Sequence, residues 1–241
     1  MVLLTRGLFI TGTNTDVGKT CVGTALAWQL SRRGLTVRPR KPVESGCPES
    51  EDGLYPQDGA AYRAAVGNTE PLARICRYRL QAPLSPERAA ALQGVEIRLQ
   101  DLVEACREGV QAEDFLLVEG AGGFYSPLTM DGLNADLAMV LGLPALLVTT
   151  DWLGTIHQTL VTAEAIARRG LTLTGVVLNE VTPVPDPRMD NAADLARWLG
   201  QEVIAVRHYG TPGLATWHEI APVLTVLADR LANDTKLGTK G

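Results

Sequence analysis

A glycine-bounded loop with the sequence GTNTDVGKT occupies residues 12–20, directly behind the apolar run Leu8-Phe9-Ile10. The run predicts a buried strand and the residues from Lys19 onward predict a helix, so the loop must turn the chain sharply. Such a turn directs backbone N–H groups and the positive end of the helix at one small volume, where an anion is stabilised. Lys19 adds a full charge, and Thr20 adds a hydroxyl suited to Mg²⁺. The loop therefore predicts a triphosphate-binding site.

The loop departs in one place from the usual P-loop pattern, which has a glycine five residues before its second glycine. Thr13 holds that position, and Gly12 lies one residue earlier. The plain alternative is a tight strand-to-helix turn with a surface lysine. The framing by strand and helix favours the phosphate site over that alternative.

Six apolar runs alternate with helical patterns, and this alternation predicts a parallel sheet. We expect strands at Leu8–Thr11, Thr36–Arg40, Phe115–Glu119, Ala145–Thr150, Leu173–Asn179 and Val203–Val206. We expect the main helices at Lys19–Arg33, Leu99–Val110, Leu133–Leu141, Thr155–Arg169, Asn191–Leu199 and His218–Leu231, several of them closed by Gly34, Gly142, Gly170 or Gly200. Because strands such as FLLV (115–118) and ALLV (145–148) are continuously apolar, we expect both faces of the sheet to be covered, as in a doubly wound α/β fold of the P-loop kind.

The 241 residues suffice for one large α/β domain, which we place at residues 1–231, with a polar, flexible tail at 232–241. Residues 42–98 interrupt the alternation with several prolines and only short helical pieces, at Asp58–Val66 and Ser85–Gln93. Long connections of this kind are usually lids or binding loops. We therefore expect this segment to cover the strand ends and contact a substrate.

Charge and cysteine usage exclude several classes of function. The net charge is −5 and the basic residues are scattered, so nucleic acid is not expected as a partner. No apolar run approaches the roughly 18 residues of a membrane helix, and no signal sequence is recognisable. Neither the cysteines nor the histidines have metal-ligand spacing, which predicts reduced thiols in a cytoplasmic protein; these residues are Cys21, Cys47, Cys76, Cys106, His157, His208 and His218.

Two further motifs follow predicted strands at the same edge of the sheet as the loop. KPVESG places Lys41 and Ser45 there, although Lys41 read alone could be a solvated lysine. EGAGG places the carboxylate of Glu119 there, as a Mg²⁺ ligand or as part of an incidental glycine-rich turn. Asp58, at the head of a short predicted helix, is a second candidate carboxylate, or a helix N-cap.

GTNTDVGKT, KPVESG and EGAGG, followed in order by LGTIHQT and VVLNE, resemble dethiobiotin synthase over almost the whole chain. This resemblance implies an ATP- and Mg²⁺-dependent cyclo-ligase of biotin biosynthesis. Such an enzyme closes a cyclic urea on 7,8-diaminononanoate with CO₂, through a carbamate and its mixed anhydride with phosphate. Holding a carbamate beside a phosphate requires converging cations, and Lys19 and Lys41 would supply them.

The resemblance also implies a role for each motif residue. Thr20, Asp58 and Glu119 would surround Mg²⁺, while Thr15, Lys41 and Ser45 would face the carbamate. Asn179 would contact the base, since its amide can donate and accept together. Phosphates would lie along the whole loop, at Gly12, Thr13, Asn14, Thr15, Asp16, Val17, Gly18, Lys19 and Thr20.

In the family the turn corresponding to Gly154-Thr155-Ile156-His157 receives the substrate's tail carboxylate across a homodimer interface. A helix N-terminus suits a carboxylate, and Thr155 could equally cap the helix. The chain departs from the family at His157, where asparagine is common, and at Arg207-His208, where Ile-Pro is usual. These departures concern recognition of the tail and of the base.

Two other classes of P-loop protein are alternatives to the synthase. A nucleotide switch of the partitioning (ParA/MinD) kind shares the fold, but it requires a second lysine where this chain has Asn14. Amide-forming ligases acting on corrin rings usually carry a glutaminase domain, for which this chain is too short. The motifs therefore favour the synthase.

Overall fold

A six-stranded parallel sheet forms the centre of the computed structural model, which describes residues 6–181, 186, 188–208 and 217–234. The strand order is β12-β11-β10-β1-β7-β2, which confirms the predicted doubly wound arrangement. The strands are β1 (Gly7–Gly12), β2 (Val37–Arg40), β7 (Phe115–Gly123), β10 (Ala145–Thr150), β11 (Leu173–Asn179) and β12 (Val203–Val206).

The predicted end of β7 at Glu119 was wrong. The strand continues to Gly123 because Gly12 of β1 pairs with Gly123 after a shift in register. Glu119 thus lies within the strand rather than at its tip, and the sheet holds its carboxylate rigidly beside the loop.

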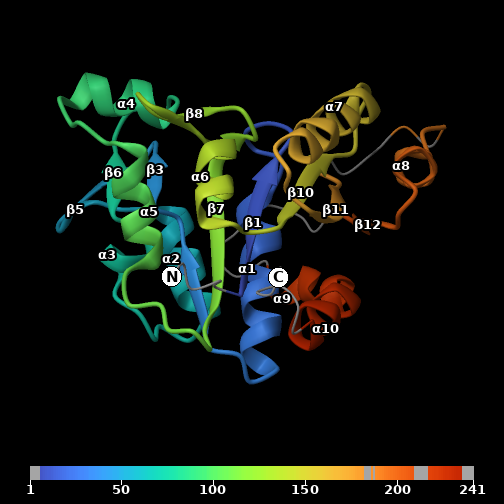
Figure 1. Cartoon of the computed structure of the whole chain (residues 1–241), viewed down its shortest axis with the longest axis horizontal. Helices are drawn as coiled ribbons and strands as arrows, with labels where there is room; N and C mark the ends of the chain where they lie inside the picture. Colours follow the sequence, from blue (N-terminus) through green and yellow to red (C-terminus); the bar gives the residue numbers. More distant parts are fainter. Residues whose placement is uncertain (1–5, 182–185, 187, 209–216, 235–241) are drawn as a thin grey trace.

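Helices cover both faces of the sheet (Figure 1), so the two sides of a strand pack into different layers. Leu8 and Ile10 pack against helix α1, whereas Phe9 between them packs against the opposite layer. The helices are α1 (Lys19–Arg32), α2 (Gln57–Ala65), α3 (Leu72–Ile75), α4 (Pro86–Gln93), α5 (Leu99–Arg107), α6 (Asn134–Leu141), α7 (Thr155–Arg168), α8 (Asn191–Leu199), α9 (Trp217–Ile220) and α10 (Thr225–Asn233).

The last predicted helix, His218–Leu231, is not continuous. A 3₁₀ turn at Ala221–Leu224 separates α9 from α10, because Pro222 lacks the N–H that a continuous helix needs. Helix α10 extends to Asn233, beyond the expected start of the tail. Residues 235–241 lie outside the described residues, so the flexible tail stays a prediction.

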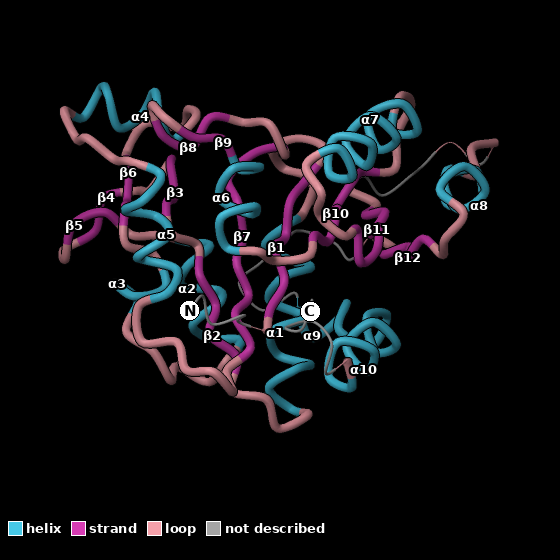
Figure 2. The backbone as a smooth tube through the Cα atoms, viewed as in Figure 1, coloured by secondary structure: helices cyan, strands magenta, loops and turns pink. Residues whose placement is uncertain are grey.

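The segment 42–98, which was expected to cover the strand ends, also forms strands of its own and contributes to the core. Besides α2, α3 and α4 it forms small strand pairs beside the central sheet (Figure 2): β3 (Val43–Ser45) with β6 (Tyr78–Leu80), and β4 (Glu49–Ser50) with β5 (Gly53–Leu54). Its Tyr62 and Ile75 lie fully buried in the same core as α1. A further hairpin, β8 (Pro127–Thr129) with β9 (Gly132–Leu133), follows β7.

Candidate active site

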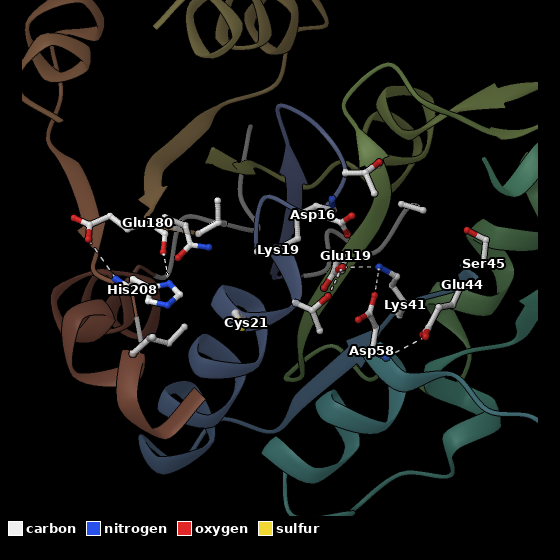
Figure 3. A pocket seen from close by; sticks show the side chains of 18 of the residues that line it. Asp16, Lys19, Cys21, Lys41, Glu44, Ser45, Asp58, Glu119, Glu180 and His208 are labelled. Atoms are coloured by element: carbon white, nitrogen blue, oxygen red, sulfur yellow. Dashed lines mark hydrogen bonds and ion pairs between the residues drawn. The ribbon is translucent and has the colours of Figure 1, made fainter. Parts of the chain in front are cut away.

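A cavity of about 510 Å³ opens where β1, β2, β7 and β11 end (Figure 3). It gathers most of the side chains predicted for the site, although they are far apart in the chain. The predicted residues that line it are Thr15, Asp16, Gly18, Lys19, Thr20, Lys41, Ser45, Asp58, Glu119 and Asn179. The remaining loop residues lie beside it, while the turn at 154–157 does not line it.

Lys41 lies at the centre of a buried charge cluster. Its Nζ donates to Glu119 Oε1 at 2.5 Å and pairs with Asp58 Oδ2 at 2.8 Å. Burial acts to lower the pKa of Lys41, but the charges of Asp58 and then Glu119 outweigh it and hold this pKa above its ordinary value. Lys41 is therefore charged at neutral pH, and because it is buried, the alternative of a solvated lysine was wrong.

The cluster fits the oxygen ligands that Mg²⁺ requires. The Thr20 hydroxyl donates to the same Glu119 Oε1 at 3.0 Å, so one hydroxyl and two carboxylates meet at one point. Two carboxylates share the single ammonium of Lys41, which leaves negative charge for a cation to balance. Among the described residues no three His, Cys, Asp or Glu side chains could hold a metal ion, but Mg²⁺ usually takes one or two carboxylates and completes its shell with phosphates and water.

The phosphate loop has the backbone that its sequence predicts. Gly18 has a φ of 94°, and a Cβ there would lie 2.1 Å from the Asn179 amide nitrogen, so only glycine fits. That nitrogen donates to the carbonyl of Val17 at 3.1 Å, which braces the loop against β11. The Asn179 amide oxygen keeps its capacity to accept from a base.

Lys19 is buried and folds back over the loop, where its Nζ donates to the Asn14 carbonyl at 3.1 Å. Burial and then the nearby charge of Lys41 lower its pKa to about 8. The pKa values of the two lysines of the cavity thus differ: that of Lys41 lies above the ordinary lysine value, and that of Lys19 is about 8.

We expect the affinity for ATP to fall as the pH rises past about 8. The free protein loses the Lys19 proton near that pH, whereas bound phosphates favour the ammonium, so binding above pH 8 must take up a proton. Each further pH unit then weakens binding by up to about tenfold. Calorimetry with ATP alone between pH 7 and 10 measures this, and an affinity that stays level to pH 10 would contradict it.

Glu44 was not predicted as a site residue, yet it lines the cavity and fixes the start of α2. Its carboxylate accepts from the backbone N–H of Asp58 at 3.0 Å and of Gly59 at 3.1 Å. Burial, followed by the charge of Asp58, raises the pKa of Glu44 to about 7. Asp58 is the second residue of α2 and does not cap it, since Pro56 holds the N-cap position; the N-cap alternative was wrong.

The turn before α7 lies outside this cavity. Thr155 does not cap the helix, because Gly154 is the N-cap and no side chain caps it. The Thr155 hydroxyl instead bonds to that of Thr149 at 2.8 Å, and Thr149 also bonds to Thr13 at 3.1 Å. Hydroxyl contacts thus connect the turn at 154–157 to the phosphate loop.

Comparison with known proteins decides the family. A family model described as an AAA domain matches residues 6–211. An ATP-dependent dethiobiotin synthetase BioD from Anaeromyxobacter dehalogenans 2CP-C is 45% identical over 83% of this chain and 89% of its own. The same-named protein of Anaeromyxobacter sp. Fw109-5 is 41% identical over 94% of this chain and 97% of its own. The chain belongs to the dethiobiotin synthetase family.

Two solved structures of other ATPases resemble this dethiobiotin synthetase family member in fold alone. The septum site-determining protein MinD of Pyrococcus horikoshii, complexed with Mg-ADP, has a TM-score of 0.58 at 16% identity and covers 98% of this chain and 100% of its own. A ParA family ATPase of Chlorobium tepidum has a TM-score of 0.52 at 14% identity, covering 96% and 97%. The P-loop fold is thereby confirmed. None of the described helices is long and apolar enough to cross a membrane.

Proposed function

We propose that this protein forms dethiobiotin from 7,8-diaminononanoate, CO₂ and ATP, with release of ADP and phosphate. One amine attacks CO₂ and loses a proton to give a carbamate, whose oxygen attacks the γ-phosphorus and displaces ADP. The second amine then attacks the carbonyl carbon, loses a proton and displaces phosphate, which closes the urea. The observation that carries the proposal is the buried pair of lysines, Lys19 and Lys41, in one cavity.

Each lysine suits one of the two anions that must meet. Lys19, with the N–H groups of residues 12–20, holds the phosphates, while the buried ammonium of Lys41 stabilises the carbamate. Thr15 and Ser45 line the cavity and offer hydroxyls to the carbamate oxygens. Thr20, Asp58 and Glu119 would hold Mg²⁺, which supplies charge neutralisation at the β- and γ-phosphates when bound.

The far end of the cavity suits the nucleobase. Asn179, Glu180 and His208 line it together, and the His208 backbone N–H donates to Glu180 Oε2 at 3.3 Å. The acceptors Asn179 Oδ1 and Glu180 suit the exocyclic amine of a base such as adenine. ATP is accordingly the proposed co-substrate.

We further propose a homodimer in the cytoplasm, in which the turn at 154–157 receives the tail carboxylate of the partner's substrate. The turn does not line its own cavity, and Leu153 beside it is 91% exposed, as expected of a surface that a second copy covers. The first turn of α7, where Gly154 and His157 are exposed, then offers backbone N–H groups that a carboxylate needs.

Replacing His157 by alanine should raise the KM for the diamine about tenfold while kcat is kept, since one hydrogen bond to a charged tail is lost. Glu164→Ala, an exposed change on the same helix, is the matched control. Steady-state kinetics that show the wild-type KM in His157→Ala would remove His157 from substrate recognition.

The reaction itself is tested by incubating the protein with the diamine, bicarbonate, Mg²⁺ and each nucleoside triphosphate in turn. We expect dethiobiotin by mass spectrometry and phosphate release that depends on the diamine. Phosphate release without any dependence on the diamine would instead indicate a nucleotide switch.

A further inference from the structure

Glu119 has a third side-chain partner, a buried one, that the reaction described above does not use. The hydroxyl of Tyr62, from helix α2, donates to Glu119 Oε2 at 2.8 Å, and the Tyr62 side chain is fully buried. Glu119 Oε1 already accepts from Lys41 and Thr20. Both carboxylate oxygens are therefore held, and the Tyr62 bond alone restrains Oε2 among the hydrogen bonds of the described residues.

The hydrogen bond between Tyr62 of α2 and Glu119 of β7 requires a residue without a side chain in α1, at Gly23. A Cβ on Gly23 would lie 1.7 Å from the Tyr62 hydroxyl oxygen and 2.8 Å from the adjoining ring carbon. Any residue other than glycine would push the ring away from Glu119. Glycine in a helix interior costs about 1 kcal/mol relative to alanine. The space for the Tyr62 ring therefore lowers the stability of α1.

Helix α2 is itself anchored at the end nearest the site. Glu44 accepts from the N–H groups of Asp58 and Gly59, which fixes the first turn of α2. Tyr62 lies one turn further along the same helix. A single rigid element thus carries both the Asp58 carboxylate and the hydroxyl that holds Glu119.

We propose that Tyr62 is a positioning residue that fixes the Glu119 carboxylate for Mg²⁺, and that Gly23 exists to admit it. The inference rests on the proposed function insofar as Glu119 is taken as a metal ligand. A ligating carboxylate whose second oxygen is hydrogen-bonded keeps its orientation when the metal binds, and loss of such a partner typically weakens metal affinity or activity 10- to 100-fold.

The test is a Mg²⁺ titration of Tyr62→Phe, with binding of a non-hydrolysable ATP analogue followed by calorimetry and no diamine present. We expect the Mg²⁺ concentration at half-saturation to rise about tenfold, while the affinity for the analogue without Mg²⁺ is unchanged. An unchanged Mg²⁺ titration would overturn the proposal. Because no turnover is measured, this outcome is independent of whether the protein makes dethiobiotin.

Two further variants separate positioning from general loss of stability. Tyr78→Phe removes a hydroxyl from β6, which does not line the cavity, and should leave the Mg²⁺ titration unchanged. Gly23→Ala should raise the Mg²⁺ concentration at half-saturation as Tyr62→Phe does. In the double variant it should add little to the effect of Tyr62→Phe. A Tyr78→Phe effect equal to that of Tyr62→Phe, or fully additive effects of the Gly23 and Tyr62 changes, would contradict the assignment.

Discussion

Replacing Lys41 by methionine should lower kcat at least 10²- to 10³-fold, because the variant keeps the length of the side chain and loses the charge that faces the carbamate. Affinity for ATP should be largely kept, since Lys19 and the loop at residues 12–20 are untouched. Rapid-quench measurement of ADP formation with the diamine, beside calorimetry with ATP, separates the two effects. Steady ring closure by Lys41→Met would remove Lys41 from the chemistry.

The same change should also destabilise the fold. Lys41 is the shared partner of Asp58 and Glu119, and removing one member of a buried ion pair typically costs about 3–5 kcal/mol. Because two uncompensated carboxylates then remain, Mg²⁺ should raise the Tm of Lys41→Met more than that of the wild type. Arg188→Met, an exposed change, is the control for loss of a positive charge. If Mg²⁺ raised the Tm of Lys41→Met and that of the wild type by the same amount, the metal assignment would be contradicted.

Replacing Glu119 by glutamine should have the second large effect. The Mg²⁺ concentration needed for half-maximal ADP formation should rise by about 100-fold or more, which exceeds the rise expected for Tyr62→Phe. The change removes the negative charge, and the new amide would oppose one of the donors from Lys41, Thr20 or Tyr62. ADP formation measured across a Mg²⁺ titration reports the effect.

The control for this variant is Glu180→Gln, which alters a carboxylate at the base end of the same cavity. Its Mg²⁺ titration should match that of the wild type, although its KM for ATP should change. A Glu119→Gln variant with the wild-type Mg²⁺ dependence would refute Glu119 as a ligand.

The fold could be predicted from the sequence because several of its strands contain unbroken apolar runs, such as residues 145–148, which occur where helices cover both faces of a sheet. The site could be predicted in outline for the same reason, since parallel strands bring their carboxyl ends to one edge. This argument predicts that Lys41 and Glu119 lie at the same edge, and in the structure Lys41 Nζ lies 2.5 Å from Glu119 Oε1.

The remaining features depend on tertiary packing that no local pattern encodes. Tyr62 reaches Glu119 only because Gly23 leaves space in a different helix, and neither residue stands in a recognisable motif. Nothing in the sequence around Glu44 indicates that its carboxylate accepts from the first turn of α2, which is 14 residues away in the chain. Pro222 was a visible signal for the break between α9 and α10 that the helical periodicity around it outweighed.

The central claim, that Lys41 holds a carbamate beside the phosphate site, is tested most directly by ¹³C NMR. Wild-type protein and Lys41→Met are each mixed with the diamine and ¹³C-labelled bicarbonate, without nucleotide. We predict a protein-bound carbamate resonance for the wild type and its loss in Lys41→Met. A carbamate signal of equal intensity in both proteins would contradict the claim.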